Sequence, residues 1–304
     1  MLNILDLGFL SLAFMVAFTG FLINHYEKHV PAFIIKGFKY GAFAYQGSDA
    51  NYLQIIEVPK ALYRHFYAFS SVFSALTLAY AVLVYYFEYS VHRYIVFMLS
   101  LILEQDEPSV SAAAVCLALL LVTIQCIRRC YETYFLQVFA KDSKMNLSHY
   151  IAGLVHYFAV VVATVGQGPL FCGSNDRSKV LWIDTRTKFL SLPCILAFLW
   201  AFYEQYKSNV IFANLRKDRT GKVITESHKI PHGRLFERVS SPHRLCEIII
   251  YTVIILLVPT KTYFCIYLWV LCNQIQTAIH AHVWYKNTFK EYPLKRDAIF
   301  PGFL

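Results

Sequence analysis

Seven long apolar segments constrain this chain more than any other feature of its sequence. A transmembrane helix needs roughly 20 predominantly apolar residues, with about 17–25 as the common range. The segments cover residues 7–25, 66–87, 110–127, 150–171, 189–203, 248–259 and 262–285. The fifth and sixth are short and would suit a thin bilayer, such as that of the endoplasmic reticulum. A further apolar stretch, 94–103, is too short to span and is expected to extend the second helix or to lie at the interface.

The composition supports an integral membrane protein. The 304 residues are 57% hydrophobic and only 15% charged, whereas about a quarter of the residues of a typical soluble domain are charged. These values exclude a disordered chain and a secreted disulfide scaffold. Most of the eight cysteines fall inside apolar runs and none forms a CxxC pair, so we expect reduced packing residues. The sequence therefore predicts an all-α integral membrane fold, a seven-helix bundle that forms one domain over residues 1–304.

Lys and Arg residues predict the orientation of the bundle, because cytosolic loops carry an excess of them. The segments that follow odd-numbered spans hold 22 Lys and Arg residues, and the opposite side holds six. This asymmetry predicts a lumenal N-terminus and a cytosolic C-terminus. It also accounts for most of the net charge of +9, so the charge indicates no nucleic-acid partner.

The expected cytosolic loop 204–247 is the segment most informative about function. It holds nine Lys and Arg residues, which would suit either anionic lipid headgroups or a bound polyanion. It also carries neutral and acidic hydrogen-bonding groups, among them Gln205, Asn209 and Glu247. This mixture favours a dinucleotide, although the sequence has no GxGxxG or P-loop pattern. No spacing typical of a metal site is present, so no metal is expected.

Polar residues at membrane depth are candidates for function. Glu57 lies shortly before the second apolar segment, and His65 and Tyr67 lie at its start. Glu57 is either an interfacial carboxylate paired with Lys60 or Arg64, or a buried acid that donates to a developing oxyanion. His65 and Tyr67 are either interface anchors or partners in the same chemistry.

Several motifs together resemble the steroid 5α-reductase family, and most closely its polyprenal/polyprenol reductase branch. The motifs run in register through about two-thirds of the chain. They are Val58-Pro-Lys60, His65-Phe-Tyr67, Arg128-Arg129-x-x-Glu132, Asn214-Leu-Arg-Lys217, His228-Lys-Ile-Pro-His-Gly233, Val239-Ser-Ser-Pro242, Glu247 and Phe289-Lys-Glu-Tyr-Pro293 with Arg296 and Pro301.

The resemblance implies a seven-helix enzyme of the endoplasmic reticulum membrane that uses NADPH. Glu57 matches the family acid that faces the substrate carbonyl, with His65 and Tyr67 beside it. His243 stands where relatives commonly have Asn, and the tyrosine that assists the acid in steroid reductases has no counterpart near Cys126. The cofactor contacts implied by position are Arg129, Gln205, Asn209, Arg216, His228, Lys229, His243, Glu247, Tyr285 and Arg296.

Carbonyl chemistry narrows the substrate that the resemblance implies. Hydride does not add to an isolated alkene or an allylic alcohol, because the developing negative charge has no acceptor. In an α,β-unsaturated aldehyde the charge reaches the oxygen, where a hydrogen-bond donor stabilises it. We therefore expect reduction of polyprenal to dolichal, in the dolichol synthesis that supports protein N-glycosylation. The long isoprenoid would enter from the bilayer, with membrane lipid as the other partner, and NADPH would enter from the cytosol.

Other functions remain open at this stage. A steroid 5α-reductase or an enoyl-thioester reductase would share the cofactor loops, and a carboxyl methyltransferase would bind a different nucleotide. A seven-span receptor is disfavoured because the seventh segment lacks an Asn-Pro-x-x-Tyr pattern. A transporter is disfavoured because the sequence shows no internal repeats or matching broken helices.

Overall fold

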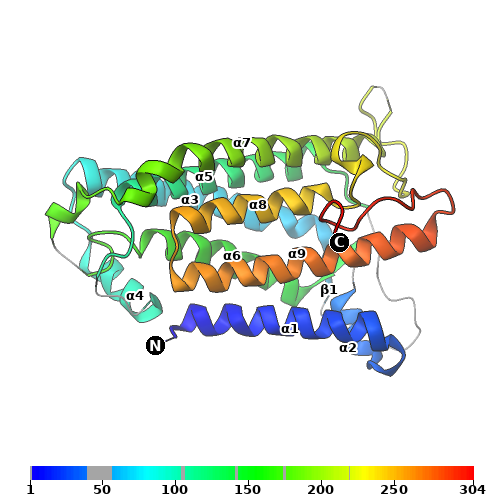
Figure 1. The fold of residues 1–304 in the computed structure, drawn as a ribbon, viewed down its shortest axis with the longest axis horizontal. Coiled ribbons are helices and arrows are strands. Elements are labelled where there is room, and N and C mark those ends of the chain that lie inside the picture. The colour runs from blue at the N-terminus through cyan, green and yellow to red at the C-terminus, as the bar shows by residue number, and fades with distance from the viewer. Residues whose placement is uncertain (1, 40–56, 104–106, 141–142, 174–175, 219) are drawn as a thin grey trace.

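Helices of very different length run side by side along the long axis of the molecule (Figure 1). The computed structural model describes residues 2–39, 57–103, 107–140, 143–173, 176–218 and 220–304. The helices are α1 Ile4–Tyr26, α2 Ala32–Phe38, α3 Tyr63–Tyr86, α4 Arg93–Leu103, α5 Ala112–Tyr131, α6 Leu147–Val165, α7 Thr185–Asn214, α8 Pro242–Leu257 and α9 Lys261–Thr288. Two short strands, β1 Glu57–Pro59 and β2 Lys144–Asn146, pair antiparallel.

Side-chain caps define where the long helices begin. Asn3 and Asp6 form a capping box at the start of α1. Ser111, Asp184 and Thr260 accept hydrogen bonds from backbone N–H groups in the first turns of α5, α7 and α9. Such caps satisfy backbone donors that have no partner inside the helix.

Among the residues that the structure describes, four helical segments are long and apolar enough to cross a membrane: Ile4–His29, Lys60–Tyr86, Ala112–Leu136 and Leu147–Val165. They coincide with the first four segments predicted from the sequence. Large apolar side chains cover their outer faces, including Phe14 and Phe18 on α1 and Leu76 on α3. Exposed apolar surface of this extent is typical of helices in contact with lipid. The protein is therefore mostly helical and multi-pass.

The remaining predicted segments are also helical, but their limits differ from the prediction. The segment 189–203 lies inside α7, which continues to Asn214, so the first part of the expected loop 204–247 is helix. The segment 248–259 lies in α8, which begins six residues earlier at Pro242, a residue favoured in the first helical turn. The segment 262–285 lies within α9. In the loop between α7 and α8, Lys217 forms a backbone bridge with Val223, and Val239 forms one with Asp297 of the tail.

Two other expectations need correction. The fourth segment was expected to reach residue 171, but α6 ends at Val165 because Gly166, Gly168 and Pro169 follow. Of the two alternatives for the stretch 94–103, extension of α3 is wrong, since α4 is a separate helix that begins at Arg93, and a position at the interface stays a prediction. All eight cysteines are unpaired, as expected for packing residues.

One end of the molecule gathers the segments that the sequence predicts to be functional. The N-terminus lies at the opposite end of α1 from β1, while the connection between α7 and α8 and the tail after α9 lie at the β1 end (Figure 1). Glu57 of β1 pairs with Asn146 of β2, which fixes the entry to α3 against the entry to α6.

Candidate functional site

A cavity of about 1250 Å³ opens at this end of the bundle. Its volume exceeds the roughly 300–1,000 Å³ that is typical of a pocket for one drug-sized ligand. Side chains from α1, α3, α5, α6, α7, α8 and α9 line it, together with the two connections that follow α5 and α7. The predicted site residues on its wall are Glu57, Tyr67, Arg129, Gln205, Asn209, Arg216, His228, Lys229, His243, Glu247 and Tyr285.

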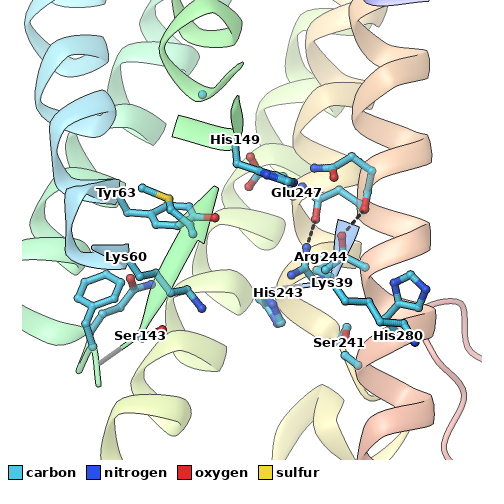
Figure 2. Close-up of a pocket in the computed structure, with 18 of the residues that line it drawn as sticks. Lys39, Lys60, Tyr63, Ser143, His149, Ser241, His243, Arg244, Glu247 and His280 are labelled. Atoms are coloured by element: carbon cyan, nitrogen blue, oxygen red, sulfur yellow. Dashed lines mark hydrogen bonds between the residues drawn. The ribbon is translucent and has the colours of Figure 1, made fainter. Parts of the chain in front are cut away.

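The cavity wall has two parts of different chemistry. Phe66, Tyr157, Tyr251 and Trp269 form an aromatic section between the helices. Towards the loops the wall is basic, and Lys39, Lys60 and Arg244 lie around the same space (Figure 2). None of these three cations was predicted as a site residue, because their position on one wall depends on the tertiary fold.

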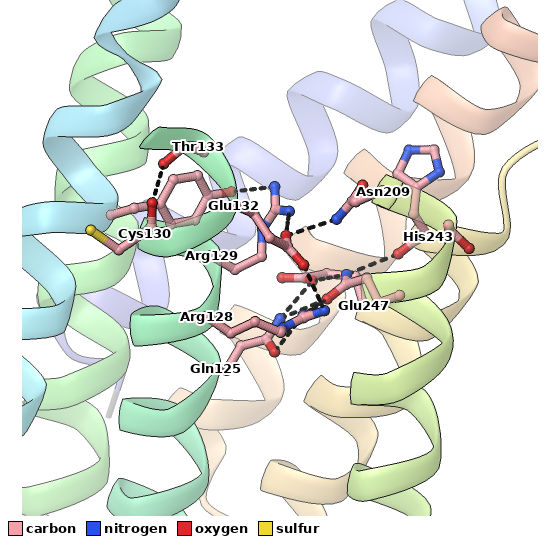
Figure 3. Close-up of polar contacts among 12 residues, drawn as sticks. Gln125, Arg128, Arg129, Cys130, Glu132, Thr133, Asn209, His243 and Glu247 are labelled. Atoms are coloured by element: carbon pink, nitrogen blue, oxygen red, sulfur yellow. Dashed lines mark hydrogen bonds and ion pairs between the residues drawn. The ribbon is translucent and has the colours of Figure 1, made fainter. Parts of the chain in front are cut away.

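A buried ion-pair network lies behind the wall, where α5 meets α7 (Figure 3). Glu132 is fully buried and pairs with both Arg128 and Arg129, each about one helical turn before it. Asn209 Nδ2 donates to Glu132 Oε2 at 2.8 Å. Glu132 lies in a π-helical turn, Glu132–Leu136, of the kind often found at functional sites. The carboxylate therefore holds two guanidinium groups and one amide in fixed positions.

Amide side chains extend this network to α8. Gln125 Nε2 donates to Gln205 Oε1 at 2.9 Å and to Glu247 Oε2 at 3.3 Å. Gln205 Nε2 in turn donates to Glu247 and, at 2.9 Å, to the carbonyl oxygen of His243. Three of the predicted cofactor contacts are thus joined to one another. Gln125 and Arg128 were missed as site residues, although their helical spacing from Arg129 and Glu132 was visible in the sequence.

Tyr67 and Glu57 take up different positions on the wall. Arg129 Nη2 donates to the Tyr67 hydroxyl oxygen at 3.2 Å and stacks 4.9 Å from its ring. Because a phenol both accepts and donates, this contact leaves the Tyr67 O–H free to donate elsewhere. Glu57 instead forms an ion pair with Lys144 at 3.8 Å, rather than with Lys60 or Arg64. The Glu57 carboxylate thus contacts the entry to α6 at the edge of the cavity.

The loop after α7 is fastened by two basic residues. Arg216 Nη1 donates to the carbonyl oxygen of Val138 at 2.6 Å, and Lys217 Nζ donates to that of Leu136 at 2.9 Å. Arg216 Nη2 also lies 3.2 Å from His228 Nε2. Burial lowers the pKa of His228, and the positive charges of Arg216 and Lys60 lower it further. This part of the wall therefore concentrates positive charge around a neutral imidazole.

Two predicted site residues do not lie on the cavity wall. His65 is exposed, and its Nδ1 lies 3.1 Å from the Tyr150 hydroxyl. It is two residues from Tyr67 on α3, so the two side chains point in different directions. Arg296 is buried, and its Nη1 donates to the carbonyl oxygen of Pro231 at 2.9 Å. It fastens the tail to the loop instead of contributing to the wall.

The described residues contain no group of three or more His, Cys, Asp or Glu side chains that could hold a metal ion. The polar groups that converge on the cavity are instead hydrogen-bond donors, amides and cations. Such a set suits phosphate and carboxamide groups better than a metal.

Comparisons with known proteins point to one family. Residues 175–304 match the family model described as 3-oxo-5-alpha-steroid 4-dehydrogenase. The chain is 37% identical over 309 residues to a polyprenal reductase of Drosophila melanogaster, covering all of this chain and 94% of the relative. It is 31% identical over 296 residues to a polyprenal reductase of Caenorhabditis elegans, covering 96% and 93%. A human polyprenal reductase is 32% identical over 187 residues, covering 61% and 58%.

Proposed function

The chain belongs to the polyprenal reductase branch of the steroid 5α-reductase family, and from this premise we propose that it uses NADPH to reduce polyprenal to dolichal. The family predicted from the loop and tail motifs is thereby confirmed. The observation that carries the proposal is that one cavity joins a basic, amide-rich mouth to an aromatic section between apolar helices. This arrangement brings an anionic cofactor and an apolar substrate to the same place.

The residues of the cavity fit a nicotinamide dinucleotide. Arg216, His228 and Lys229 lie on the wall that the loop supplies, where cations suit phosphate groups. His243 Nδ1 and Ser241 Oγ are buried without hydrogen-bond partners among the described residues, as polar atoms awaiting a ligand would be. When bound, the nicotinamide supplies a hydride. Gln205 and Asn209 are held by the buried network in positions to orient it.

We assign the stabilisation of the substrate oxygen to Tyr67. Arg129 holds the phenol by donating to its oxygen, and this leaves the Tyr67 O–H to donate to the substrate. A donor fixed in this way is worth roughly 3–4 kcal/mol when charge develops on an aldehyde oxygen. Glu57 then serves to hold Lys144 and the β1–β2 pair at the cavity edge.

The same proposal includes seven membrane spans and residence in the endoplasmic reticulum. The outer face of α7 supports the count, since Phe189, Leu192, Leu196 and Leu199 are exposed and lie on one face of that helix. The polar side chains of its second half face the site, which lowers its overall hydropathy. The basic cavity mouth would then lie on the cytosolic side, with the C-terminus, and the N-terminus would be lumenal.

Product analysis tests the function directly. Purified protein in detergent is incubated with NADPH and a medium-length polyprenal, with polyprenol and a 3-keto-4-ene steroid in parallel. A gain of two hydrogens by polyprenal alone supports the proposal. Reduction of the steroid instead would assign the chain to the steroid 5α-reductases of the same family. Turnover of none of the three substrates would contradict the proposed reaction.

Arg216→Ala is expected to weaken NADPH binding roughly tenfold or more, because a charged hydrogen bond to phosphate is worth about 1.5–3 kcal/mol. The measurement is equilibrium binding by quenching of protein fluorescence. Lys217→Ala is the matched control, since Lys217 fastens the same connection without lining the cavity. Equal loss in both variants would show that Arg216 acts only by holding the loop.

Binding of NADP⁺ is expected to strengthen as the pH falls from about 7 to 6. The pKa of His228 is lowered in the free protein, and a nearby phosphate would raise it, so binding would take up a proton. The complex then binds more protons than the free protein, and its affinity rises by up to about tenfold per pH unit. Isothermal titration of the protein and of His228→Gln measures this slope. A slope unchanged by His228→Gln would place the phosphate elsewhere.

A further inference from the structure

A buried histidine–tyrosine pair on the cavity wall has no role in the reaction described so far. His156 of α6 and Tyr251 of α8 both line the cavity, and both are less than a tenth exposed. His156 Nε2 lies 2.6 Å from the Tyr251 hydroxyl oxygen. Tyr251 is one helical turn beyond Glu247, so it lies deeper between the helices than the amide and acid groups.

The unpaired nitrogen of His156 indicates which group donates. Among the described residues, His156 Nδ1 is buried and has no hydrogen-bond partner. Buried N–H groups without an acceptor are rarer than buried acceptors without a donor. The favoured tautomer therefore carries its hydrogen on Nε2 and donates it to the Tyr251 oxygen. The Tyr251 O–H is then free to donate into the cavity.

Aromatic contacts connect this pair to the proposed donor for the substrate oxygen. The ring of His156 lies 5.1 Å from that of Tyr157, which lies 5.4 Å from Tyr67. Trp269 packs 4.9 Å from His156 on the other side. Tyr67 and Tyr251 are thus two phenols on one wall, each with its oxygen held by a cationic or imidazole N–H. Conjugate reduction of an enal needs two such donors, one for the oxygen and one for the α-carbon.

We propose that Tyr251, positioned by His156, protonates the α-carbon of the substrate; this rests on the proposed reduction of polyprenal. Hydride addition to the β-carbon leaves an enolate. Its carbon–carbon π electrons form the new α-C–H bond with the proton of Tyr251, whose O–H electrons stay on the phenolate oxygen, and the carbonyl re-forms. The His156 Nε2–H stabilises that phenolate until water returns the proton. Tyr251 is the catalytic residue and His156 its positioning residue.

Reduction in D₂O tests this assignment, because the α-carbon then receives one deuteron. The aldehyde is converted to the alcohol at quench so that the label is retained, and the deuterated face is read by NMR. The unmodified protein should deuterate one face. Tyr251→Phe should lower the rate about 10²–10⁴-fold and give deuteration on both faces, with NADPH affinity within about twofold of the unmodified protein.

Further variants separate chemistry from folding. Tyr263→Phe removes a buried phenol that does not line the cavity and should change neither rate nor face. His156→Gln keeps an N–H donor and should retain one-face deuteration, whereas His156→Leu should lose it. Full rate and one-face deuteration in Tyr251→Phe would overturn the inference. Absence of polyprenal reduction by the unmodified protein would overturn the proposed function itself.

Discussion

Replacing Tyr67 with phenylalanine is expected to lower the turnover of polyprenal about 10²–10³-fold while NADPH affinity stays within about twofold. Removing one donor that stabilises a developing oxyanion has an effect of this size. Phenylalanine keeps the ring that packs against Tyr157 and under Arg129. The loss would therefore fall on the chemical step, and the measurement is kcat with saturating NADPH beside a binding titration.

Two variants make this prediction specific. Tyr150→Phe removes a hydroxyl that lies 3.1 Å from Nδ1 of the exposed His65 and does not line the cavity, so turnover should be unchanged. Glu57→Gln should lower turnover less than about tenfold, because Glu57 is placed here as the partner of Lys144. If Glu57→Gln abolishes turnover and Tyr67→Phe does not, the family acid is the donor and the assignment of Tyr67 is wrong.

The helices were largely predictable because their signals are local. An apolar run of about 20 residues predicts a membrane-spanning helix whatever its neighbours in the fold are, as α1, α3 and α5 illustrate. Helix ends were less predictable. The second half of α7 is polar, and its helical conformation is stabilised by packing against neighbouring helices rather than by its own sequence. Its polar residues Gln205 and Asn209 are buried against α5 and α8, where their hydrogen bonds are satisfied.

The cavity wall was predictable where a single segment supplies it. Arg216, His228 and Lys229 lie in one loop, and the structure places all three on the cavity wall. The buried network was not predictable, because Gln125 meets Gln205 and Glu247 across 80 and 122 residues of sequence. No periodicity in the chain shows which helices become neighbours, so such pairs emerge only from the fold.

Glu132→Ala is expected to destabilise the protein by roughly 3–5 kcal/mol, the cost of removing one partner from a buried ion pair. Glu132 is fully buried, and its loss would leave Arg128 and Arg129 without their carboxylate. Arg128 also donates to the carbonyl oxygen of Phe202 at 3.0 Å, but that contact cannot neutralise its charge. The apparent unfolding temperature in detergent should fall by roughly 10 °C.

A second ion pair provides the control for this last prediction. Glu107 pairs with Lys179, but its side chain is 75% exposed, so Glu107→Ala should change the unfolding temperature little. Glu132→Gln keeps the shape of the side chain and one acceptor oxygen. Its unfolding temperature should therefore lie between those of Glu132→Ala and Glu107→Ala. Because Glu132 also positions Asn209 and, through Arg129, Tyr67, folded Glu132→Gln protein should lose turnover as well as stability. Equal stability of Glu132→Ala and Glu107→Ala would show that the network does not hold the bundle together.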